Sequence, residues 1–483
     1  MNDLSQPLPP LWRALALVAP MQARVSGLLP AAVHGISIDS RSLAPGDLFF
    51  AIRGDNSDGH DYVAQAFAAG AGAAVVDEAH AEALRGAGPL LIVHDVQSAL
   101  ERLGMAARQR CKGRIAAITG SVGKTSSKEA LALMLRQVGP THAAVASFNN
   151  HWGVPLTLAR MPEASRFGVF EIGMNHAGEI TPLVAMVRPH VALVTTIAPV
   201  HLEHFASVDD IARAKGEIFS GLVPGGAAII NRDIAQFPLL EAMARQSPAR
   251  HIMSFGRDPG AEAQLIEADV REGATYVKAR VLGQELEFRI GAAGVHFAQN
   301  ALGLLLAARA MGLDLGKAAA ALFEFGAPKG RGETSTLMLA DGQASLIDES
   351  YNANPASMRA ALAVLAAAKP TTNEGRRMAV LGDMLELGDQ SSALHRALSE
   401  DIEQLGIDQV FTVGPMMVGL YEALPASRRA ASAATALDMI ALVQGSVRSG
   451  DVIMVKGSNS SRMGLIVTAL REAFANRTPA VEI

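Results

Sequence analysis

One short segment of the sequence has the residue types of a phosphate-binding loop: Gly120-Ser121-Val122-Gly123-Lys124-Thr125-Ser126. Glycines let a backbone close around an anion with its amide groups pointing inward, and a following helix N-terminus adds partial positive charge. Lys124 is placed to reach the β- and γ-phosphates of a nucleotide, and the Thr125 hydroxyl to bind Mg²⁺. The spacing G-x-x-G-K-T is shorter than the usual G-x-x-x-x-G-K-[ST]. We expect nucleotide binding here, with an incidental glycine turn as the alternative.

Three more side chains could take part in chemistry beside such a loop: Glu171, His201 and Lys215. Glu171 ends an apolar run, where a carboxylate is costly unless it is paired or bound to a metal ion. We expect a metal ligand there, the alternative being a core carboxylate paired with a basic group. His201 follows another apolar run and could bind a second Mg²⁺ or orient a phosphate, although a lone loop histidine is more often structural. Lys215, taken alone, is typical of a solvent-exposed helix lysine.

Alternating strands and helices must position these side chains. Such alternation predicts parallel sheets covered on both faces, with ligands beyond the carboxyl ends of the strands. Leu131, Met134, Leu135 and Val138 follow helical spacing after the glycine-rich segment. The sequence predicts three blocks, 1–110, 111–328 and 329–483. Strands are expected at 33–39, 47–52 and 73–76, then at 115–119, 167–172, 191–197 and 227–230, and finally at 345–347, 378–381, 410–413 and 452–455.

The composition supports a large globular protein. At roughly 150 residues per domain, 483 residues suggest about three domains. The net charge of −5, without a polybasic run, argues against nucleic acid as a main partner. The single cysteine, Cys111, excludes an internal disulfide and a cysteine zinc site. No apolar run approaches the ~18 residues of a membrane span, so we expect a cytoplasmic protein.

Several segments together resemble the ATP-dependent Mur ligases of peptidoglycan synthesis, over nearly the whole chain. They are Asp39-Ser40-Arg41 and Asp58-Gly59-His60 in the first block, Asn149–Thr157, Glu171–Asn175 and Ala198–Glu203 in the second, and Tyr351–Met358 in the third. The short phosphate loop also matches the form found in this family. The resemblance implies an α/β fold of three domains: a smaller α/β N-terminal domain for a uridine nucleotide, a central P-loop parallel-sheet ATPase domain, and a C-terminal Rossmann-like domain.

The resemblance also implies roles for individual residues. For ATP it implies Gly120, Ser121, Val122, Gly123, Lys124, Thr125, Ser126, Asn300, Arg331 and Asp348; for the substrates, Ser40, Arg41, Asn150, Asn352 and Asn354. It assigns the metal ions to Thr125, Glu171, His201 and Lys215, and catalysis to Lys124, His201, Lys215 and Arg331. Three positions depart from the family pattern. Phe297 replaces an asparagine, Asp348-Glu349 replaces a paired aspartate and leaves open which carboxylate meets the ribose, and Asn459 replaces an arginine, with Arg462 two residues after Ser460.

The implied reaction uses ATP, two Mg²⁺ ions and a carbamate on Lys215. It joins D-alanyl-D-alanine to UDP-MurNAc-tripeptide through an acyl phosphate, catalysed by a monomer. The Tyr351–Met358 segment favours this dipeptide-adding member of the family over one that adds a single amino acid. From another class, a P-loop NTPase or kinase remains an alternative, but it would not account for the first and third blocks. A degenerate nucleotide-binding ligase would need Lys124, Glu171 or His201 replaced, and all three are present.

Overall fold

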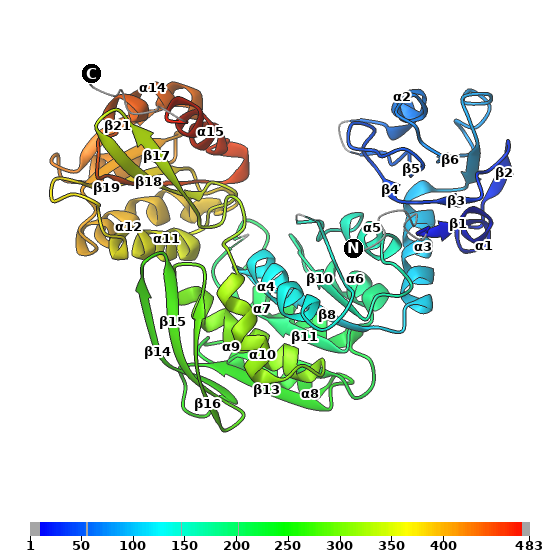
Figure 1. Ribbon diagram of the computed structural model, residues 1–483, viewed down its shortest axis with the longest axis horizontal. Helices are drawn as coiled ribbons and strands as arrows, with labels where there is room; N and C mark the ends of the chain where they lie inside the picture. The colour runs from blue at the N-terminus through cyan, green and yellow to red at the C-terminus, as the bar shows by residue number, and fades with distance from the viewer. Residues whose placement is uncertain (1–9, 55–56, 146, 201, 476–483) are drawn as a thin grey trace, which may run out of the picture.

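The computed structural model describes residues 10–54, 57–145, 147–200 and 202–475 of the chain. These residues fold into three α/β domains that follow one another in sequence and form an open arch, with the first and third domains at its ends (Figure 1). The predicted three-domain α/β fold is confirmed. Among the described residues, no helix is both long and apolar enough to cross a membrane.

The first domain contains β1 (Trp12–Arg13), β2 (Arg24–Ser26), β3 (Ala32–Val33), β4 (Ile36–Ser37), β5 (Leu48–Phe50), β6 (Ala73–Asp77), β7 (Leu90–Val93), α1 (Val18–Met21), α2 (Val63–Ala68) and α3 (Val96–Arg110). Its five-stranded sheet has the order β2-β7-β6-β5-β4. The strands β4 to β7 run parallel, and β2 pairs antiparallel with β7. Leu100 and Leu103 of α3 pack in one apolar cluster with β5, β6 and β7.

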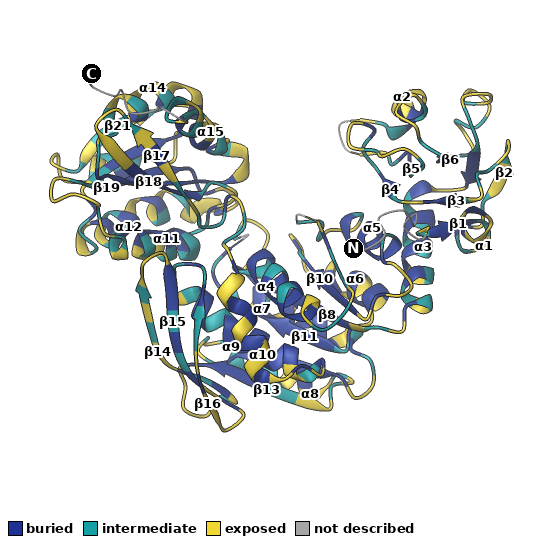
Figure 2. Ribbon diagram, viewed as in Figure 1, coloured by how far each residue is buried: buried dark blue, intermediate teal, exposed yellow. Residues whose placement is uncertain are grey.

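The middle domain contains β8 (Arg114–Thr119), β9 (Thr141–Ala143), β10 (Phe167–Glu171), β11 (Val191–Val194), β12 (Ala227–Asn231), β13 (His251–Gly256), β14 (Ala263–Arg271), β15 (Ala274–Val281), β16 (Gln284–Ile290), α4 (Lys124–Arg136), α5 (Gly153–Ala159), α6 (Ile180–Val187), α7 (Val208–Gly216), α8 (Phe237–Arg245), α9 (Val295–Ala310) and α10 (Leu315–Ala321). The nine strands form one sheet in the order β16-β15-β14-β13-β12-β11-β8-β10-β9. Helices α4, α9 and α10 cover one face and α5 to α8 the other. The central strands are therefore buried on both faces (Figure 2).

The order of the middle sheet fixes where a ligand can bind. The strand β8 lies between β10 and β11, and all three run parallel. After β8 the chain continues through α4 to β9 on one side of β8, and after β10 it continues through α6 to β11 on the other side. This reversal of direction opens a crevice at the carboxyl end of β8. In the register of the sheet, Glu171 at the end of β10 stands opposite Ile118 of β8, two residues before the glycine-rich segment begins at Gly120.

The strands β9, β13, β14, β15 and β16 of this sheet were not predicted from the sequence. Beyond β14 the strands β15 and β16 run antiparallel and extend the sheet at one edge. Each hairpin turns through two residues with positive φ, at Glu272 and Gly273 (54° and 71°) and at Leu282 and Gly283 (50° and 82°). Such turns match the twist of antiparallel strands. The middle sheet is therefore mixed rather than parallel throughout.

The third domain contains β17 (Glu333–Leu339), β18 (Gly342–Glu349), β19 (Arg377–Gly382), β20 (Gln409–Val413), β21 (Arg429–Ala433), β22 (Val452–Lys456), α11 (Pro355–Ala367), α12 (Ser391–Gln404), α13 (Val418–Ala423), α14 (Ala436–Ser446) and α15 (Gly464–Ala473). Its sheet has the order β17-β18-β22-β19-β20-β21 and is parallel except for β17. The returning strand β22 pairs with β18, so that Lys456 stands opposite Glu349.

Buried contacts join the first domain to the middle domain. The indole of Trp12 donates a hydrogen bond to the Ala159 carbonyl at 2.9 Å. The guanidinium of Arg110 donates to the carbonyls of Leu11 and Met161 at 3.0 and 3.1 Å, and it stacks 3.3 Å from the centre of the Trp12 ring. The apolar cluster of the first domain also includes residues of α5. These two domains consequently share one packed interface.

His142 in β9 should make the stability of the middle domain depend on pH. Its Nε2 lies 2.7 Å from the Thr157 carbonyl, and burial lowers the pKa of His142 from 6.5 to about 4. The unfolded chain therefore binds the proton first, so the stabilisation present above pH 6.5 is lost as the pH falls towards 4. From this group alone we expect roughly 2 kcal/mol less stability at pH 5 than at pH 7.

Chemical unfolding of the full chain at both pH values checks this prediction. His142→Gln keeps an N–H donor but cannot titrate, so the difference between pH 7 and pH 5 should become smaller. His251→Gln is the matched control, because His251 is exposed at the start of β13. An unchanged pH difference in His142→Gln would show that this histidine is not buried in its neutral form.

Candidate active site

The glycine-rich segment forms the turn between β8 and α4. Gly120 and Gly123 have φ values of 149° and 85°, a region that side chains rarely adopt. A Cβ atom on Gly120 would collide with the Thr195 hydroxyl, and one on Gly123 would lie 2.6 Å from the Asn300 amide nitrogen. Both positions therefore require glycine, and the loop lies at the carboxyl end of β8 as the sequence predicts.

Contacts from the segment after β11 hold the loop in shape. The Ser121 amide donates to the Thr196 carbonyl at 2.8 Å. The Ser121 hydroxyl donates to the Ala198 carbonyl at 3.1 Å, and the Thr195 hydroxyl donates to the Val122 carbonyl at 2.6 Å. These bonds fix the loop before any anion binds, which lowers the entropy cost of binding.

Lys124 is bound to its own loop in this structure. Its Nζ donates to the Gly120 carbonyl at 2.7 Å. Burial lowers the pKa of Lys124; the nearby Arg331 lowers it further, whereas Glu171 raises it. The ammonium group therefore lies against the first residue of the glycine-rich turn.

Glu171 lies at the centre of a network of oxygen ligands. Its side chain is 1% exposed. One carboxylate oxygen accepts from the Thr125 hydroxyl at 2.8 Å and the other from the Asn149 amide at 2.7 Å, while Ser147 Oγ lies 3.1 Å from Thr125 Oγ1. Among the described residues no lysine or arginine forms an ion pair with Glu171. A buried carboxylate and hydroxyls without a cationic partner are the donor set that Mg²⁺ prefers.

Lys215 is not the solvent-exposed lysine that its local sequence suggests. It lies near the end of α7 and is 1% exposed. Burial lowers the pKa of Lys215 well below its usual value, and Lys124 lowers it further. The described residues supply no acidic partner within ion-pair distance. The structure therefore brings two lysines together beside the phosphate loop. The fourth predicted metal ligand, His201, lies outside the described residues.

The third domain contributes Arg331 to the same site. Its guanidinium donates to the Ser147 hydroxyl at 3.2 Å and lies 4.2 Å from the centre of the Tyr351 ring. Arg331 therefore connects the segment between the middle and third domains to the hydrogen-bonded oxygen atoms around Glu171.

A cavity of about 490 Å³ lies between the middle and third domains and collects most of these groups. The phosphate loop forms one wall, and residues of α9, β18 and β22 form another. Its lining includes Ser121, Val122, Gly123, Lys124, Thr125, Ser126, Asn149, Glu171, His296, Asn300, Arg331, Glu349, Asn352, Asn354 and Lys456. Burial lowers the pKa of His296, so a neutral imidazole faces this space.

The structure separates the two candidate carboxylates for the ribose. Glu349 lines the cavity and accepts from Lys456 Nζ at 3.2 Å. Asp348 points to the other face of β18, where it accepts from the Ser350 hydroxyl at 2.6 Å. Phe297 is 6% exposed and packs edge-on against Phe325, 5.8 Å between ring centres, as part of the core.

The predicted substrate residues fall into separate places. Asn352 lines the cavity, and Asn354 caps α11 by accepting from the Ser357 amide at 2.9 Å. Ser40 and Arg41 lie in the first domain and do not line the cavity, and Asn150 is exposed beside α5. Arg41 is exposed and paired with Asp39 at 2.8 Å.

Sequence reasoning missed several groups of this site. Ser147, His296, Tyr351 and Lys456 were not assigned roles, although all four line the cavity. Lys456 follows the strand predicted at 452–455, and His296 precedes Phe297, where the sequence departs from the family pattern. Their positions at the end of a strand and at the start of a helix could have marked them as site residues. Nothing local marks Ser147, whose loop follows no regular pattern.

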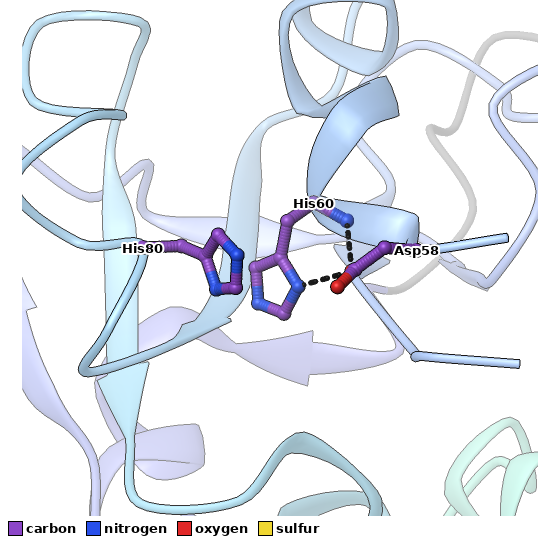
Figure 3. A group of neighbouring side chains, drawn as sticks. All are labelled: Asp58, His60 and His80. Carbon is purple, nitrogen blue, oxygen red and sulfur yellow. Dashed lines mark hydrogen bonds and ion pairs between the residues drawn. The ribbon is translucent and has the colours of Figure 1, made fainter.

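A second cluster of ionisable side chains lies in the first domain (Figure 3). His60 Nδ1 lies 2.6 Å from Asp58 Oδ1, and the Asp77 amide donates to His60 Nε2 at 3.1 Å. Both ring nitrogens of His60 are therefore engaged, with Nδ1 as the donor. The ring of His80 stacks on it, 4.0 Å between centres and 15° from parallel. His80 Nδ1 lies 2.7 Å from Asp77 Oδ1, so this ring is also held by a protein group, and the cluster anchors the loop through its own contacts.

Comparison with known proteins gives the same family over most of the chain. Three family models match in succession: "Mur ligase family, catalytic domain" over residues 32–110, "Mur ligase middle domain" over residues 118–308, and "Mur ligase, glutamate ligase domain" over residues 334–459. The order of the models is the order of the domains in the structure.

Individual relatives agree with the family models. The UDP-N-acetylmuramoyl-tripeptide–D-alanyl-D-alanine ligase of Escherichia coli is 35% identical over 441 residues, which cover 91% of this chain and 94% of that protein. The crystal structure of MurF from Acinetobacter baumannii is 30% identical, with a TM-score of 0.82 over 97% of this chain and 100% of that one. MurF from Thermotoga maritima in complex with ADP, at 22% identity, shares the fold with a TM-score of 0.75 over 91% and 97%.

Proposed function

The chain belongs to the Mur ligase family, and on that premise we propose that it joins D-alanyl-D-alanine to UDP-MurNAc-tripeptide with ATP as the energy source. The observation that carries the proposal is the cavity of about 490 Å³, in which the phosphate loop, Glu171 and Arg331 meet. The similarity to the Escherichia coli ligase over 91% of the chain supports the choice of substrates within the family.

ATP binds with its phosphates on the loop between β8 and α4. The loop amides and Lys124 neutralise the β- and γ-phosphates. Asn300, which touches Gly123 from α9, contributes to the nucleotide site. Glu349 is better placed than Asp348 to hold the ribose, because Glu349 lines this cavity and Asp348 does not.

Two Mg²⁺ ions complete the proposed site. Thr125 and Glu171 fit the first, since their oxygens converge without a cationic partner among the described residues. His201 and a carbamate on Lys215 are the proposed ligands of the second. When bound, these ions offset the negative charge of the phosphates and of the carboxylate brought beside them.

A carbamate on Lys215 would remove the repulsion between Lys215 and Lys124. Burial and Lys124 favour the neutral amine of Lys215, and a neutral amine is the form that attacks carbon dioxide. The new N–C bond forms as one proton leaves, and the product is an anion. This anion would face Lys124 and a metal ion instead of repelling them.

The proposed reaction activates a carboxylate that is a poor acyl donor. The γ-phosphoryl group of ATP passes to the terminal carboxylate of the tripeptide, which gives an acyl phosphate and ADP. The amine of the dipeptide then attacks the carbonyl carbon, loses a proton, and phosphate leaves as the amide forms. Lys124 and Arg331 stabilise the charge on the transferring group, and the third domain excludes water that would hydrolyse the acyl phosphate.

The remaining parts of the proposal concern the uridine end and the setting of the reaction. Ser40 and Arg41 contribute to a uridine-nucleotide site in the first domain, and Asn150, Asn352 and Asn354 contribute to binding of the peptide substrates. We also propose that the chain acts as a monomer. The cytoplasm is the proposed location, because ATP and UDP-linked precursors are available there.

Phosphate release tests the proposed function. With ATP and Mg²⁺ present, full turnover should require UDP-MurNAc-tripeptide and D-alanyl-D-alanine together, and mass spectrometry should detect UDP-MurNAc-pentapeptide. Omission of either substrate is the control. Turnover with a single free amino acid would instead identify an amino-acid-adding member of the family. Equal phosphate release without the peptide substrates would indicate a simple NTPase and would contradict the ligase proposal.

A further inference from the structure

A second cavity lies beside the first, on the side of the third domain. Its volume is about 730 Å³, and it shares Thr125, Ser147 and Arg331 with the nucleotide cavity. The ring of Tyr351 under the Arg331 guanidinium stands in the wall common to both. None of its lining residues belongs to the first domain. The lining of the second cavity therefore comes from the middle domain, the third domain and the segment between them, and it reaches the phosphate loop at Thr125.

Arg462 supplies an available positive charge in this second cavity. Its side chain is exposed, and among the described residues no acidic group lies within ion-pair distance of it. The two acidic residues in the lining are already engaged. Glu129 pairs with Lys128 at 2.8 Å, and Asp348 accepts from Ser350 at 2.6 Å. Neither therefore neutralises the Arg462 guanidinium.

The backbone at Arg462 is held in an unusual conformation. Its φ of 53° and ψ of 33° lie in the left-handed region, which is unfavourable for a side chain other than glycine. Two hydrogen bonds fix it: the Arg462 amide donates to the Asn459 carbonyl at 3.1 Å, and the Leu465 amide donates to the Arg462 carbonyl at 2.9 Å. The strain is retained at the point where the chain passes from β22 into α15, at the rim of the cavity.

The chemistry of the cavity matches one substrate of the proposed reaction. Leu465 and Tyr351 are 38% and 37% exposed and present apolar surface beside Arg462. D-alanyl-D-alanine carries two methyl groups, an amine that must reach the acyl phosphate near Thr125, and a free carboxylate at its far end. A guanidinium binds a carboxylate through two parallel hydrogen bonds, which an ammonium group cannot do.

We propose that Arg462 binds the C-terminal carboxylate of the incoming dipeptide in this second cavity and so selects a substrate with a free carboxyl end. The inference rests on the proposed function, and it assigns a residue that lies one turn away from the position where the family pattern has an arginine. Lys329 lines the same cavity and is exposed, so it is the competing cation.

The test compares D-alanyl-D-alanine with its C-terminal amide as acceptor in the full-length enzyme. In the unmodified enzyme the amide should have a KM higher by about 10- to 100-fold, the usual effect of losing a charge-assisted bidentate contact. Arg462→Ala should raise the KM for the dipeptide by a similar factor and should remove the preference over the amide. The kcat at saturating dipeptide and the KM for ATP should change by less than about threefold.

Two variants serve as controls. Arg462→Lys keeps a charge at the same backbone position and should retain part of the preference. Arg396→Ala removes an exposed arginine of α12 that does not line either cavity, and it should behave like the unmodified enzyme.

The outcomes separate the inference from the proposed function. A full preference for the dipeptide in Arg462→Ala would overturn the inference, as would loss of the preference in Lys329→Ala alone. Failure of the unmodified enzyme to use the dipeptide at all would overturn the proposed function together with the inference. A raised KM for both acceptors with the preference intact would show a structural effect and would also reject the carboxylate contact.

Discussion

Lys124→Ala should lower the rate of ATP-dependent ligation by about a thousandfold or more, while the chain stays folded. The magnitude is that of removing one preorganised charge that stabilises a phosphoryl-transfer transition state. The fold should survive, because among the described residues the Lys124 ammonium donates only to the Gly120 carbonyl of its own loop.

Three measurements check the Lys124 prediction: initial rates of phosphate release with both substrates, affinity for ATP, and the thermal unfolding midpoint. The rate should fall far more than the midpoint, which should move by only a few degrees. Lys112→Ala is the matched control, since Lys112 is exposed and does not line the cavity. Near-normal turnover of Lys124→Ala would reject the assignment of this loop as the phosphate site.

Lys215→Ala should also abolish most activity, but for a different reason. The proposed role of Lys215 is to become an anion, so alanine removes a metal ligand rather than a cation. The truncated side chain leaves space in a buried position beside Lys124. A small carboxylate such as formate or acetate has the charge and oxygen ligands of the lost carbamate, so it should restore part of the rate.

The rescue experiment separates a carbamate from a plain lysine. Activity of Lys215→Ala should rise with added formate and saturate, whereas Lys124→Ala should show no such rise. A signal from the carbamate carbon in the unmodified enzyme, after exposure to labelled bicarbonate, is an independent readout. Lys317→Ala, an exposed lysine of α10, serves as the control for added salt. Full activity of Lys215→Ala without any additive would disprove the carbamate role.

The general plan of the fold could be predicted from the sequence because it depends on local patterns. The apolar runs predicted at 115–119, 167–172 and 452–455 correspond closely to β8, β10 and β22. The phosphate loop was recognisable because glycines occupy fixed positions in it. The structure gives the reason: a Cβ atom on Gly120 or Gly123 would collide with a neighbouring side chain. Glu171 attracted attention because a carboxylate at the end of a buried strand has few structural explanations. The structure places it in the cavity, and its role as a metal ligand stays a prediction.

Other features depend on which face of an element a residue occupies, and sequence alone did not decide them. Asp348 and Glu349 are neighbours on β18, so they point to opposite faces, and only the pairing with β22 places Glu349 towards the cavity. Phe297 follows His296 on α9, but the former packs in the core and the latter lines the site.

Two further differences come from tertiary contacts. Lys215 resembled a surface lysine because helical spacing does not reveal which helix face meets the phosphate loop. The antiparallel strands β15 and β16 were missed, although their residues alternate and each turn ends in glycine, because the turns begin with Glu272 and Leu282 rather than with the asparagine or aspartate typical of such hairpins.

The packed interface between the first and middle domains has a consequence for which length of peptide substrate the protein accepts. The bonds made by Trp12 and Arg110 join these two domains. We expect this interface to keep the distance from the proposed uridine site to the phosphate loop nearly constant, so that only a bridging peptide of matching length places its carboxylate at the loop. Each residue removed shortens an extended peptide by roughly 3.5 Å. The carboxylate of a precursor with only two amino acids would not reach Lys124. The enzyme would therefore reject this shorter peptide because of its length, before any side chain is recognised.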